Sequence, residues 1–290
     1  MTLPIRRERK REHGFTLVEL ILVIVLVGII GGVLTMMLAP AIQSYLLVGQ
    51  RAALTTVADT ALRTIAVDVR RAVPNSLRLT NPQCLELVPT SDGGRYRSGP
   101  IVGRTDARYI NDAEPGTAFD VLTRFTNTPA AGDVIVVGNR GDEVYTANSP
   151  SVAVVQSVTA SPAAALGEHR IQLGTSLQVP PGYDGGRFVV VPAARRIVTY
   201  RCSAGIDAGG SGTGTLVRLN GNNLAAPPAC GNVVPAGAQL VATKVSSCSF
   251  VVHANAGATQ DSGYVQLQLT LSDKGESVPL TVGVNVSNVP

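Results

Sequence analysis

Hydrophobic positions divide the chain into an uninterrupted apolar stretch, a helical stripe and a long series of short alternating runs. Residues 15–38 form the apolar stretch, in which Glu19 is the only formally charged side chain. A helix of this length rises by about 1.5 Å per residue and can cross a bilayer core of about 30 Å. The stretch is therefore predicted to be a membrane-spanning helix.

A helical stripe follows the apolar stretch. Between Leu54 and Val73, apolar side chains recur at steps of three and four, which is the period of one buried helix face. The opposite face carries Thr, Asp and Arg, and Asp59 and Arg63 stand in the favourable i, i+4 order. This amphipathic segment is predicted to pack against the rest of the chain, because its apolar face needs cover.

The two segments are predicted to form one helix over Phe15–Val73, roughly 90 Å long. Pro40 lacks an amide donor and is expected to kink the helix or open it locally. Pro74 and Asn75 are expected to end it, because the residue before a proline avoids the α conformation.

Residues 76–290 are predicted to be β-rich, because short apolar or alternating runs are separated by turn residues and no later helical stripe is present. The predicted strands are Cys84–Val88, Phe119–Phe125, Asp133–Val137, Val152–Val158, Arg170–Leu173, Arg187–Val191, Arg196–Cys202, Leu216–Leu219, Leu240–Val245, Cys248–Val252, Val265–Leu271 and Leu280–Val286. Asp273–Glu276 is the predicted turn of a hairpin between the last two, and Asp92–Gly94, Asp184–Gly186 and Gly205–Gly214 are predicted loops. The expected fold class is α+β, a long amino-terminal helix packed on a large β-rich body.

Charge is concentrated before the apolar stretch. Residues 6–13 contain five basic and two acidic side chains, so they supply +3 of the +4 net charge of the whole chain. The positive-inside bias keeps such a segment in the cytoplasm, which places the β-rich body on the other side of the membrane. Because the rest of the chain is nearly neutral, no nucleic-acid partner is expected.

Neither a secretory signal nor a plain membrane anchor explains the whole pattern. The apolar run is longer than the roughly 7 to 15 residues of a signal-peptide core, and no small-residue cleavage site clearly ends it. An anchor gives no reason for Glu19, since a carboxylate in a membrane helix is costly and usually has a partner or a function.

The run Gly14-Phe15-Thr16-Leu17-Val18-Glu19-Leu20 resembles the processing motif of type IV prepilins and type II secretion pseudopilins. In that family a membrane aspartyl peptidase cuts after the glycine and methylates the new terminal amine. The resemblance implies cleavage between Gly14 and Phe15, and N-methylation of Phe15. The terminal ammonium of one subunit would then neutralise Glu19 of its neighbour in the apolar core of a filament. An uncleaved signal anchor is the alternative.

The resemblance also implies a domain organisation. Residues 1–14 would be a cleaved basic leader, 15–39 the transmembrane half of the helix, 40–75 its amphipathic half, and 76–290 a periplasmic or extracellular pilin body. The protein would span the bacterial inner membrane once, with its amino terminus in the cytoplasm, and then join a pilus at the cell surface. Its implied partners are the prepilin peptidase, the inner-membrane assembly platform, other minor pilins and the major pilin.

Later segments narrow the resemblance to the MSHA pilus biogenesis protein O group, large minor pilins related to the J-type pseudopilins. The segments are Asp68–Asn75, Arg195–Cys202, Val245–Phe250, Gly275–Leu280 and Val284–Pro290. Both ends of the chain are covered well, and residues 90–190 poorly. The resemblance implies a structural minor pilin that primes or caps pilus assembly at the filament tip. A J-like pseudopilin of type II secretion and a tip adhesin or DNA-uptake pilin are the alternatives.

Four cysteines lie in the β-rich body. An even number outside the cytoplasm favours two disulfides, with three connectivities open. We favour Cys202 with Cys230, which would close the glycine-rich segment between them, and Cys84 with Cys248, which would tie the first strand to a late one. Free thiols are the alternative.

No residue pattern predicts catalysis, a metal site or a cofactor. His169 and His253 stand alone, and the cysteines lack the Cys-x-x-Cys spacing of a zinc site. Gly209–Gly214 is followed by neither a lysine nor a helix, so a turn is favoured over a phosphate loop. Basic side chains between Arg95 and Arg108 have acidic ones among and around them, which favours a solvated loop. The prediction is a structural protein and not an enzyme.

Overall fold

The computed structural model describes residues 14–226, 230–231, 237–253 and 263–287. The chain divides into two compact units, Met1–Gln50 and Arg51–Pro290. The basic segment 6–13 of the expected leader lies outside the described residues. Helix α1 (Leu17–Arg70) continues through Pro40 without a break, so the local opening expected there does not occur.

Short elements make up the rest of the described chain. They are β1 (Arg78–Asn81), β2 (Cys84–Leu87), β3 (Asp92–Arg95), β4 (Gly116–Val121), β5 (Val134–Val136), η1 (Asp142–Tyr145), β6 (Val152–Ala160), η2 (Ala164–Leu166), β7 (His169–Leu177), β8 (Arg187–Val191), β9 (Ile197–Cys202), β10 (Gly214–Gly221), β11 (Gln239–His253), β12 (Tyr264–Asp273) and β13 (Glu276–Asn285). The α+β class expected from the sequence is confirmed.

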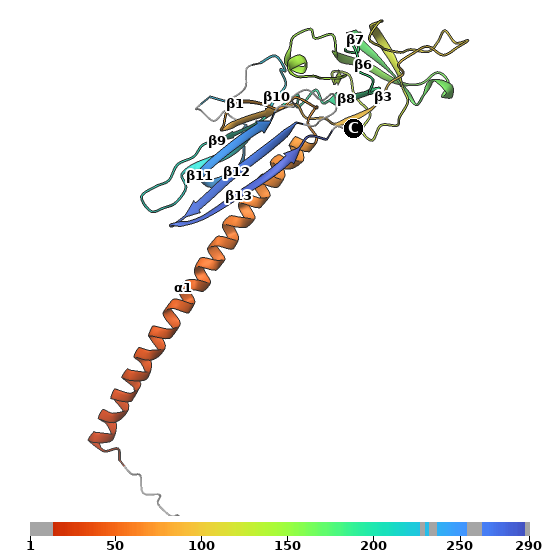
Figure 1. The fold of residues 1–290 in the computed structure, drawn as a ribbon. Helices are drawn as coiled ribbons and strands as arrows, with labels where there is room; N and C mark the ends of the chain where they lie inside the picture. Colours follow the sequence, from red (N-terminus) through yellow and green to blue (C-terminus); the bar gives the residue numbers. More distant parts are fainter. Residues whose placement is uncertain (1–13, 227–229, 232–236, 254–262, 288–290) are drawn as a thin grey trace, which may run out of the picture. The chain divides into compact units, whose positions relative to one another are not determined.

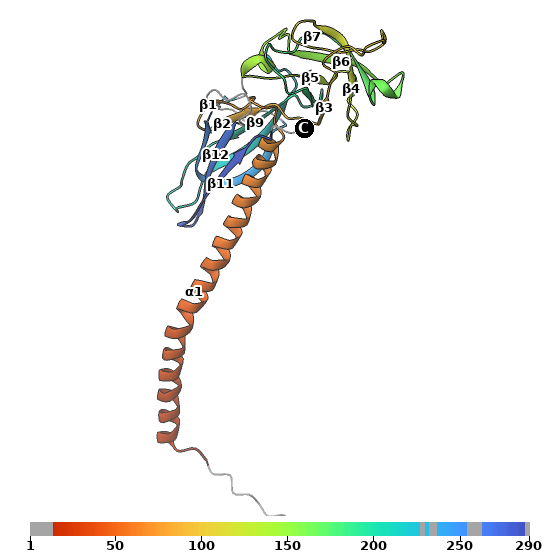
Figure 2. The same cartoon turned by 45° about the vertical axis from the view of Figure 1, so that its right-hand side comes forward.

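One layer of the second unit is an antiparallel seven-stranded sheet in the order β1-β2-β9-β10-β11-β12-β13. Residues 51–70 of α1 pack on one of its faces (Figure 1, Figure 2). The positions of the expected helical stripe are all buried, namely Leu54, Ala58, Ala61, Leu62, Ile65, Val69 and Val73. From Leu54 to Val69 the segment therefore packs as its pattern indicates, with the sheet as its cover. The helix was expected to reach Val73, but α1 ends at Arg70, and Val73 packs in a different apolar cluster.

A cluster of polar side chains ties α1 to this sheet. Asp68 Oδ2 accepts a hydrogen bond from Tyr200 Oη at 2.7 Å and another from Arg218 Nε at 2.8 Å. Tyr200 on β9 is fully buried, and the side chain of Arg218 on β10 is only 9% exposed. Arg218 also donates from Nη1 to Asn220 Oδ1 at 2.8 Å. The carboxylate of Asp68 thus fixes the helix against two strands at once.

The second sheet has six strands in the order β3-β8-β5-β6-β7-β4, and its two edges meet. The backbone N–H of Arg97 donates to Asp120 O, and that of Leu122 donates to Arg95 O, both at 2.9 Å. These bonds flank a bridge between Tyr96 and Val121. The sheet is therefore a small closed barrel with its own apolar core.

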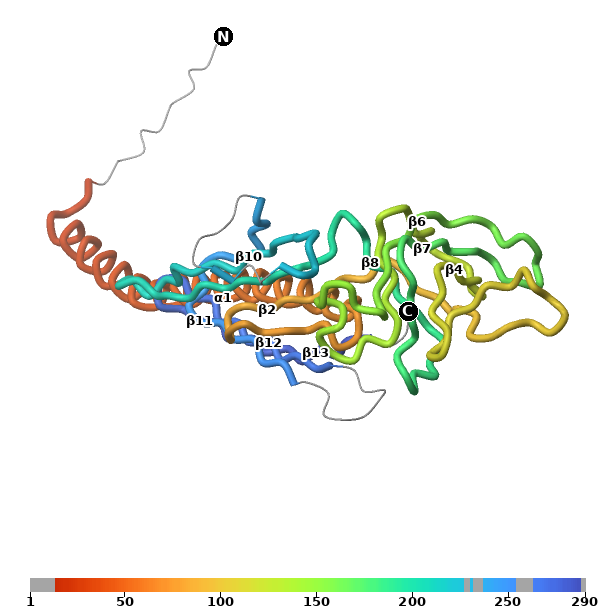
Figure 3. Tube along the Cα trace, turned by 90° about the horizontal axis from the view of Figure 1, so that it is seen from above, coloured from red at the N-terminus to blue at the C-terminus, as the bar shows by residue number. Residues whose placement is uncertain are grey.

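The barrel is inserted between two neighbouring strands of the seven-stranded sheet. Leu87 at the end of β2 pairs with Val198 in β9, and every barrel strand lies between them in the sequence. Figure 3 shows the barrel strands β4, β6, β7 and β8 at one end of this unit. A third apolar cluster, which includes Val73, Val88 and Tyr145, packs where barrel and sheet meet.

Two turn predictions have different outcomes. The hairpin at Asp273–Glu276 is confirmed, with Lys274 and Gly275 at φ 50° and 85°, as a type I′ turn requires. The expected loop Asp92–Gly94 is wrong, because it lies in β3 and pairs with β8. A Cβ at Gly94 would lie 3.2 Å from the ring of Phe188, so this glycine permits close packing within a strand.

The four cysteines form two disulfides, as expected, but the expected pairing is wrong. Cys84 is joined to Cys230, and Cys202 is joined to Cys248. The structure therefore contains neither the Cys202–Cys230 nor the Cys84–Cys248 bond.

The alternation of side chains along β9 explains the pairing. Cys84 is opposite Arg201 in the ladder, and the Arg201 guanidinium donates to Gly231 O, so the segment with Cys230 lies on that face of the sheet. Cys202 is the next residue and points to the opposite face, where it joins Cys248 in the core beneath α1.

Buried tyrosines make the stability of this unit sensitive to high pH. Burial raises the pKa of Tyr96, Tyr145, Tyr183 and Tyr200 above the ordinary value of a tyrosine. A raised folded-state pKa leaves stability complete below the unfolded value of about 10 and removes it as the pH rises further. We expect the urea midpoint to fall between about pH 9 and pH 11, and to fall less steeply in Tyr200→Phe. A midpoint independent of pH in this range would contradict the prediction.

Candidate functional site

The expected processing site lies immediately before α1. Residues Gly14, Phe15 and Thr16 are not helical, and Phe15 is 80% exposed. Thr16 caps the helix, because its Oγ1 accepts a hydrogen bond from the N–H of Glu19 at 3.3 Å. The bond between Gly14 and Phe15 is thus in an open segment, where a peptidase can reach it without unwinding a helix.

The fold gives no internal reason for a glycine at position 14. A Cβ placed there would meet no atom within 4 Å, and Gly14 does not have a positive φ. Glycine is required where φ is positive or where another group approaches closely. Neither applies to Gly14 within the described chain, so the described fold does not itself require glycine at this position.

Glu19 lies in the first turn of α1 and is exposed. Over the described ranges, no hydrogen bond or ion pair to its carboxylate is present. The amino end of a helix favours an acidic side chain, by roughly 0.3–1 kcal/mol, which does not offset placing a carboxylate in lipid. Its carboxylate is therefore free to neutralise a cation on another molecule.

The apolar part of α1 has no cover among the described residues. All residues from Gly14 to Gly49 are exposed, and no formal charge occurs between Glu19 and Arg51. Among the described residues, α1 is the one helix whose length and composition would allow it to cross a membrane. A Cβ added at Gly28, Gly31 or Gly32 would meet no described atom within 4 Å. This segment therefore has the length, composition and exposure that a membrane anchor needs.

Residues 9–35 match the family described as Prokaryotic N-terminal methylation motif. The chain carries a type IV pilin-like prepilin signal. The matched residues include Gly14, Phe15 and Glu19, and the match supports the prepilin and pseudopilin family, with processing by prepilin peptidase. The apolar helix that follows fits the membrane anchor of a prepilin. No curated protein and no solved structure gives a significant match to the chain.

The other candidates take ordinary structural positions. His169 lies against the ring of Phe125 at 5.0 Å between centroids, and His253 lies against Tyr264 at 5.7 Å. No group of three potential metal ligands is found in the part of the chain that the structure describes. Arg104 makes hydrogen bonds of 2.9 and 2.6 Å to the carboxylate of Asp106, so its charge is used locally.

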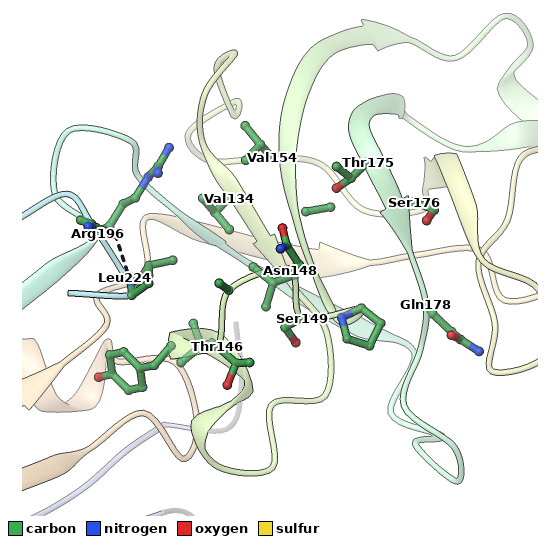
Figure 4. Close-up of a pocket in the computed structure, with 18 residues that line it drawn as sticks. Val134, Thr146, Asn148, Ser149, Val154, Thr175, Ser176, Gln178, Arg196 and Leu224 are labelled. Atoms are coloured by element: carbon green, nitrogen blue, oxygen red, sulfur yellow. Dashed lines mark hydrogen bonds between the residues drawn. The ribbon is translucent and has the colours of Figure 1, made fainter. Parts of the chain in front are cut away.

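A hollow of about 460 Å³ opens on the side of the barrel. Figure 4 shows Asn148, Val154 and Thr175 around it, with Ser176 and Gln178 at one side. Its lining has no Asp, Glu, His, Cys or Lys, and Arg196 is the one charged side chain among the lining residues. The lining therefore offers no acid and base pair for catalysis.

The polar clusters of the body have no signature in the sequence. Asp68 meets Tyr200 and Arg218 across separations of 132 and 150 residues. Asp120, fully buried in the barrel, pairs with Arg170 at 2.8 Å across 50 residues. The one sequence signal for the Asp68 cluster is the position of Asp68 beside Val69 of the buried stripe. An acidic side chain at the edge of a buried helix face needs a hydrogen-bond partner or a counter-charge.

Proposed function

We propose that this chain is a minor pilin, cut between Gly14 and Phe15, N-methylated at Phe15, and placed at the tip of an MSHA-type pilus, where it primes or caps assembly. The methylation motif over residues 9–35 carries this proposal, since it covers the peptide bond, the new amino terminus and Glu19 together. N-terminal sequencing of the membrane-fraction protein is expected to begin at N-methylated Phe15. Any other start contradicts the processing step.

The large body supports a minor subunit over a repeating shaft subunit. The barrel occupies the connection between β2 and β9 and adds a second core to the sheet that packs on α1. A shaft subunit must repeat at close spacing along the whole filament, and a bulky insertion is easiest to place at an end. The chain acts here as a structural subunit, and the energy of assembly comes from elsewhere.

A J-like pseudopilin of type II secretion is the second candidate, because it would carry the same processing signal. A tip adhesin or DNA-uptake pilin is favoured by the inserted barrel, which could hold its own ligand. Deletion of the gene separates the three. Loss of surface pili supports the minor pilin, loss of exoprotein export supports the pseudopilin, and normal piliation with lost adhesion or transformation supports a binding role.

The variant Glu19→Ala is expected to be processed normally but to be nearly absent from filaments. Without the carboxylate, the terminal ammonium of the neighbouring subunit stays unpaired in an apolar core. Leaving a buried charge unpaired costs about 3–5 kcal/mol, which corresponds to a more than about hundredfold lower equilibrium constant for entering the filament. Immunoblots of sheared filaments and of membranes measure the filament-to-membrane ratio, which is the amount of this protein in filaments divided by the amount left in the membrane. Glu19→Asp keeps the charge and is the matched control. Glu19→Ala filaments with the wild-type content would show that Glu19 makes no such contact.

A further inference from the structure

β13 is an end strand of the seven-stranded sheet and pairs with β12 alone. Among the described residues no strand pairs with its other edge (Figure 1). The other end strand, β1, has four residues, whereas β13 has ten, and the edges of the barrel are joined to each other. β13 is therefore the longest open strand edge in the described part of the chain.

The turn before β13 determines which backbone groups point outward. Asp273 and Glu276 flank a two-residue turn and form a hydrogen-bonded pair, so bonded positions alternate from there along the strand. The residues whose N–H and C=O face away from β12 are Ser277, Pro279, Thr281, Gly283 and Asn285. Pro279 has no N–H, so it interrupts the row of donors, as prolines on guarded edges do. An uninterrupted row of donors remains from Thr281 to Asn285.

The sheet face beside this edge has no charge. Alternate residues of Ser247–His253, Tyr264–Thr270 and Ser277–Asn285 share the face that points away from α1, through pairs such as Ser249 with Gln268 and Gln268 with Thr281. None of them is Asp, Glu, Lys or Arg, and most carry hydroxyl or amide groups. Depletion of charge marks the centres of protein interfaces, and the lack of Lys and Arg argues against a polyanion.

The uncharged face of β11, β12 and β13 is too small to bind a partner without help from the edge of β13. Three strands about 4.8 Å apart and about 23 Å long present roughly 330 Å². A standard interface buries about 800 Å² on each side, so this face alone would not hold a partner. Backbone hydrogen bonds from an added strand would supply both further area and direction.

We propose that the edge of β13 from Thr281 to Asn285 receives an extended strand from the body of a different pilin-like subunit, which also covers the uncharged face. This inference rests on the proposed function, because it names how the minor pilin contacts a different subunit. The strand would bond to the free N–H and C=O groups of Thr281, Gly283 and Asn285, and uncharged side chains of the partner would lie over Gln268.

A second copy of this chain fits the edge poorly. α1 and β13 run in the same direction, since Arg51 pairs with Glu276 at one end and Ser287 N donates to Arg70 O at the other. Antiparallel pairing of β13 with itself would therefore turn residues 51–70 of two copies in opposite directions. Subunits of a polar filament keep one direction, so antiparallel pairing between two copies does not fit a filament, and the proposal assigns the strand to a chain of different sequence.

The test replaces one outward donor on each side of Pro279 in the full-length chain, in piliated cells. Thr281→Pro removes a donor of the proposed contact without removing a bond to β12. Ser277→Pro makes the same backbone change outside the contact and is the control. It also removes the hydrogen bond of 2.8 Å between the hydroxyls of Ser277 and Ser272, so it is the more severe change for the fold itself. We expect Thr281→Pro to lower the filament-to-membrane ratio at least about fivefold, the effect of one hydrogen bond, and Ser277→Pro to leave it unchanged. Both variants must keep the two disulfides and the start at Phe15.

Equal ratios for Thr281→Pro and the wild type would overturn the inference, as would an equal loss in Ser277→Pro. A wild-type chain that never enters filaments would instead overturn the proposed function. Should Thr281→Pro fail to fold, benzoylphenylalanine at position 281 provides a second measurement. An adduct with a different protein that carries an N-terminal methylation motif supports the contact. An adduct between two copies, or no adduct, overturns it.

Discussion

The variant Gly14→Val is expected to remain at full length, with its basic leader attached and its amino terminus unmethylated. A Cβ placed at position 14 would meet no described atom within 4 Å, so the described fold tolerates a side chain there. The peptidase that reads the site must accommodate the added side chain beside the bond it cuts, and forcing added atoms into a close-fitting site costs about 1–3 kcal/mol. Processing should fall at least about tenfold, which intact-mass measurement of the membrane-fraction protein detects.

Gly28→Val is the matched control for this experiment. A Cβ added at Gly28 would also meet no atom within 4 Å, and this residue lies in the apolar part of α1 beyond the processing site. The leader of this variant should therefore be removed at the wild-type rate. Equal processing of Gly14→Val and Gly28→Val would mean that the glycine before Phe15 is not read, and the proposed cleavage site would have to be abandoned.

The variant Asp68→Ala is expected to lose about 3 kcal/mol of stability in the β-rich unit. Removing the carboxylate leaves the nearly buried guanidinium of Arg218 without its counter-charge, and breaking a buried ion pair from one side costs about 3–5 kcal/mol. Tyr200 loses the acceptor of its 2.7 Å hydrogen bond as well. Urea unfolding of the full chain in detergent, followed by tyrosine fluorescence, measures the change.

Asp59→Ala is the control for the loss of an acidic side chain from the same helix. Asp59 pairs with Arg63 at 2.6 Å, but both side chains are largely exposed, at 47% and 77%. An exposed pair of this kind contributes about 0.3–0.5 kcal/mol. If the two variants unfold at the same urea concentration, the buried cluster does not hold the helix to the sheet.

Local patterns in the sequence predicted the elements whose residues depend on their near neighbours. The stripe from Leu54 to Val69 indicated the buried face of α1, although its continuation to Val73 placed the end of the helix three residues too late. The alternation in Tyr264–Leu271 indicated β12 and its hairpin. β1 (Arg78–Asn81) was missed because it is short and polar, and β3 was missed because Gly94 looks like a turn residue until Phe188 packs on it.

The barrel could not be predicted, because its closure depends on bonds between residues 95–97 and 120–122 that no local pattern encodes. Its strands lie within residues 92–191, which is also the part of the chain that the sequence resemblance covered poorly. In this region, alternating runs predicted individual strands but not their arrangement.

The contrast between local patterns, which are predictable, and long-range pairing, which is not, also applies to the functional residues and the disulfides. Gly14, Phe15 and Glu19 lie within six residues of one another, so a contiguous motif identified them. The cysteine pairing and the open edge of β13 depend on strand register, which places Cys202 and Arg201 on opposite faces. A shift of the strand register by one residue moves every side chain to the other face of the sheet. No tight turn joins β2 to β9, so the sequence did not reveal the register between these two strands.

The pairing of Leu87 with Val198 has a consequence for the history of such chains. Paired residues on antiparallel strands are about 4.5–5.5 Å apart, so the chain enters and leaves the barrel through a gap that a tight turn could close. A gene could gain, lose or exchange the segment between these two positions while the helix and the seven-stranded sheet kept their register. The same junction is where a foreign domain could be grafted onto this helix and sheet.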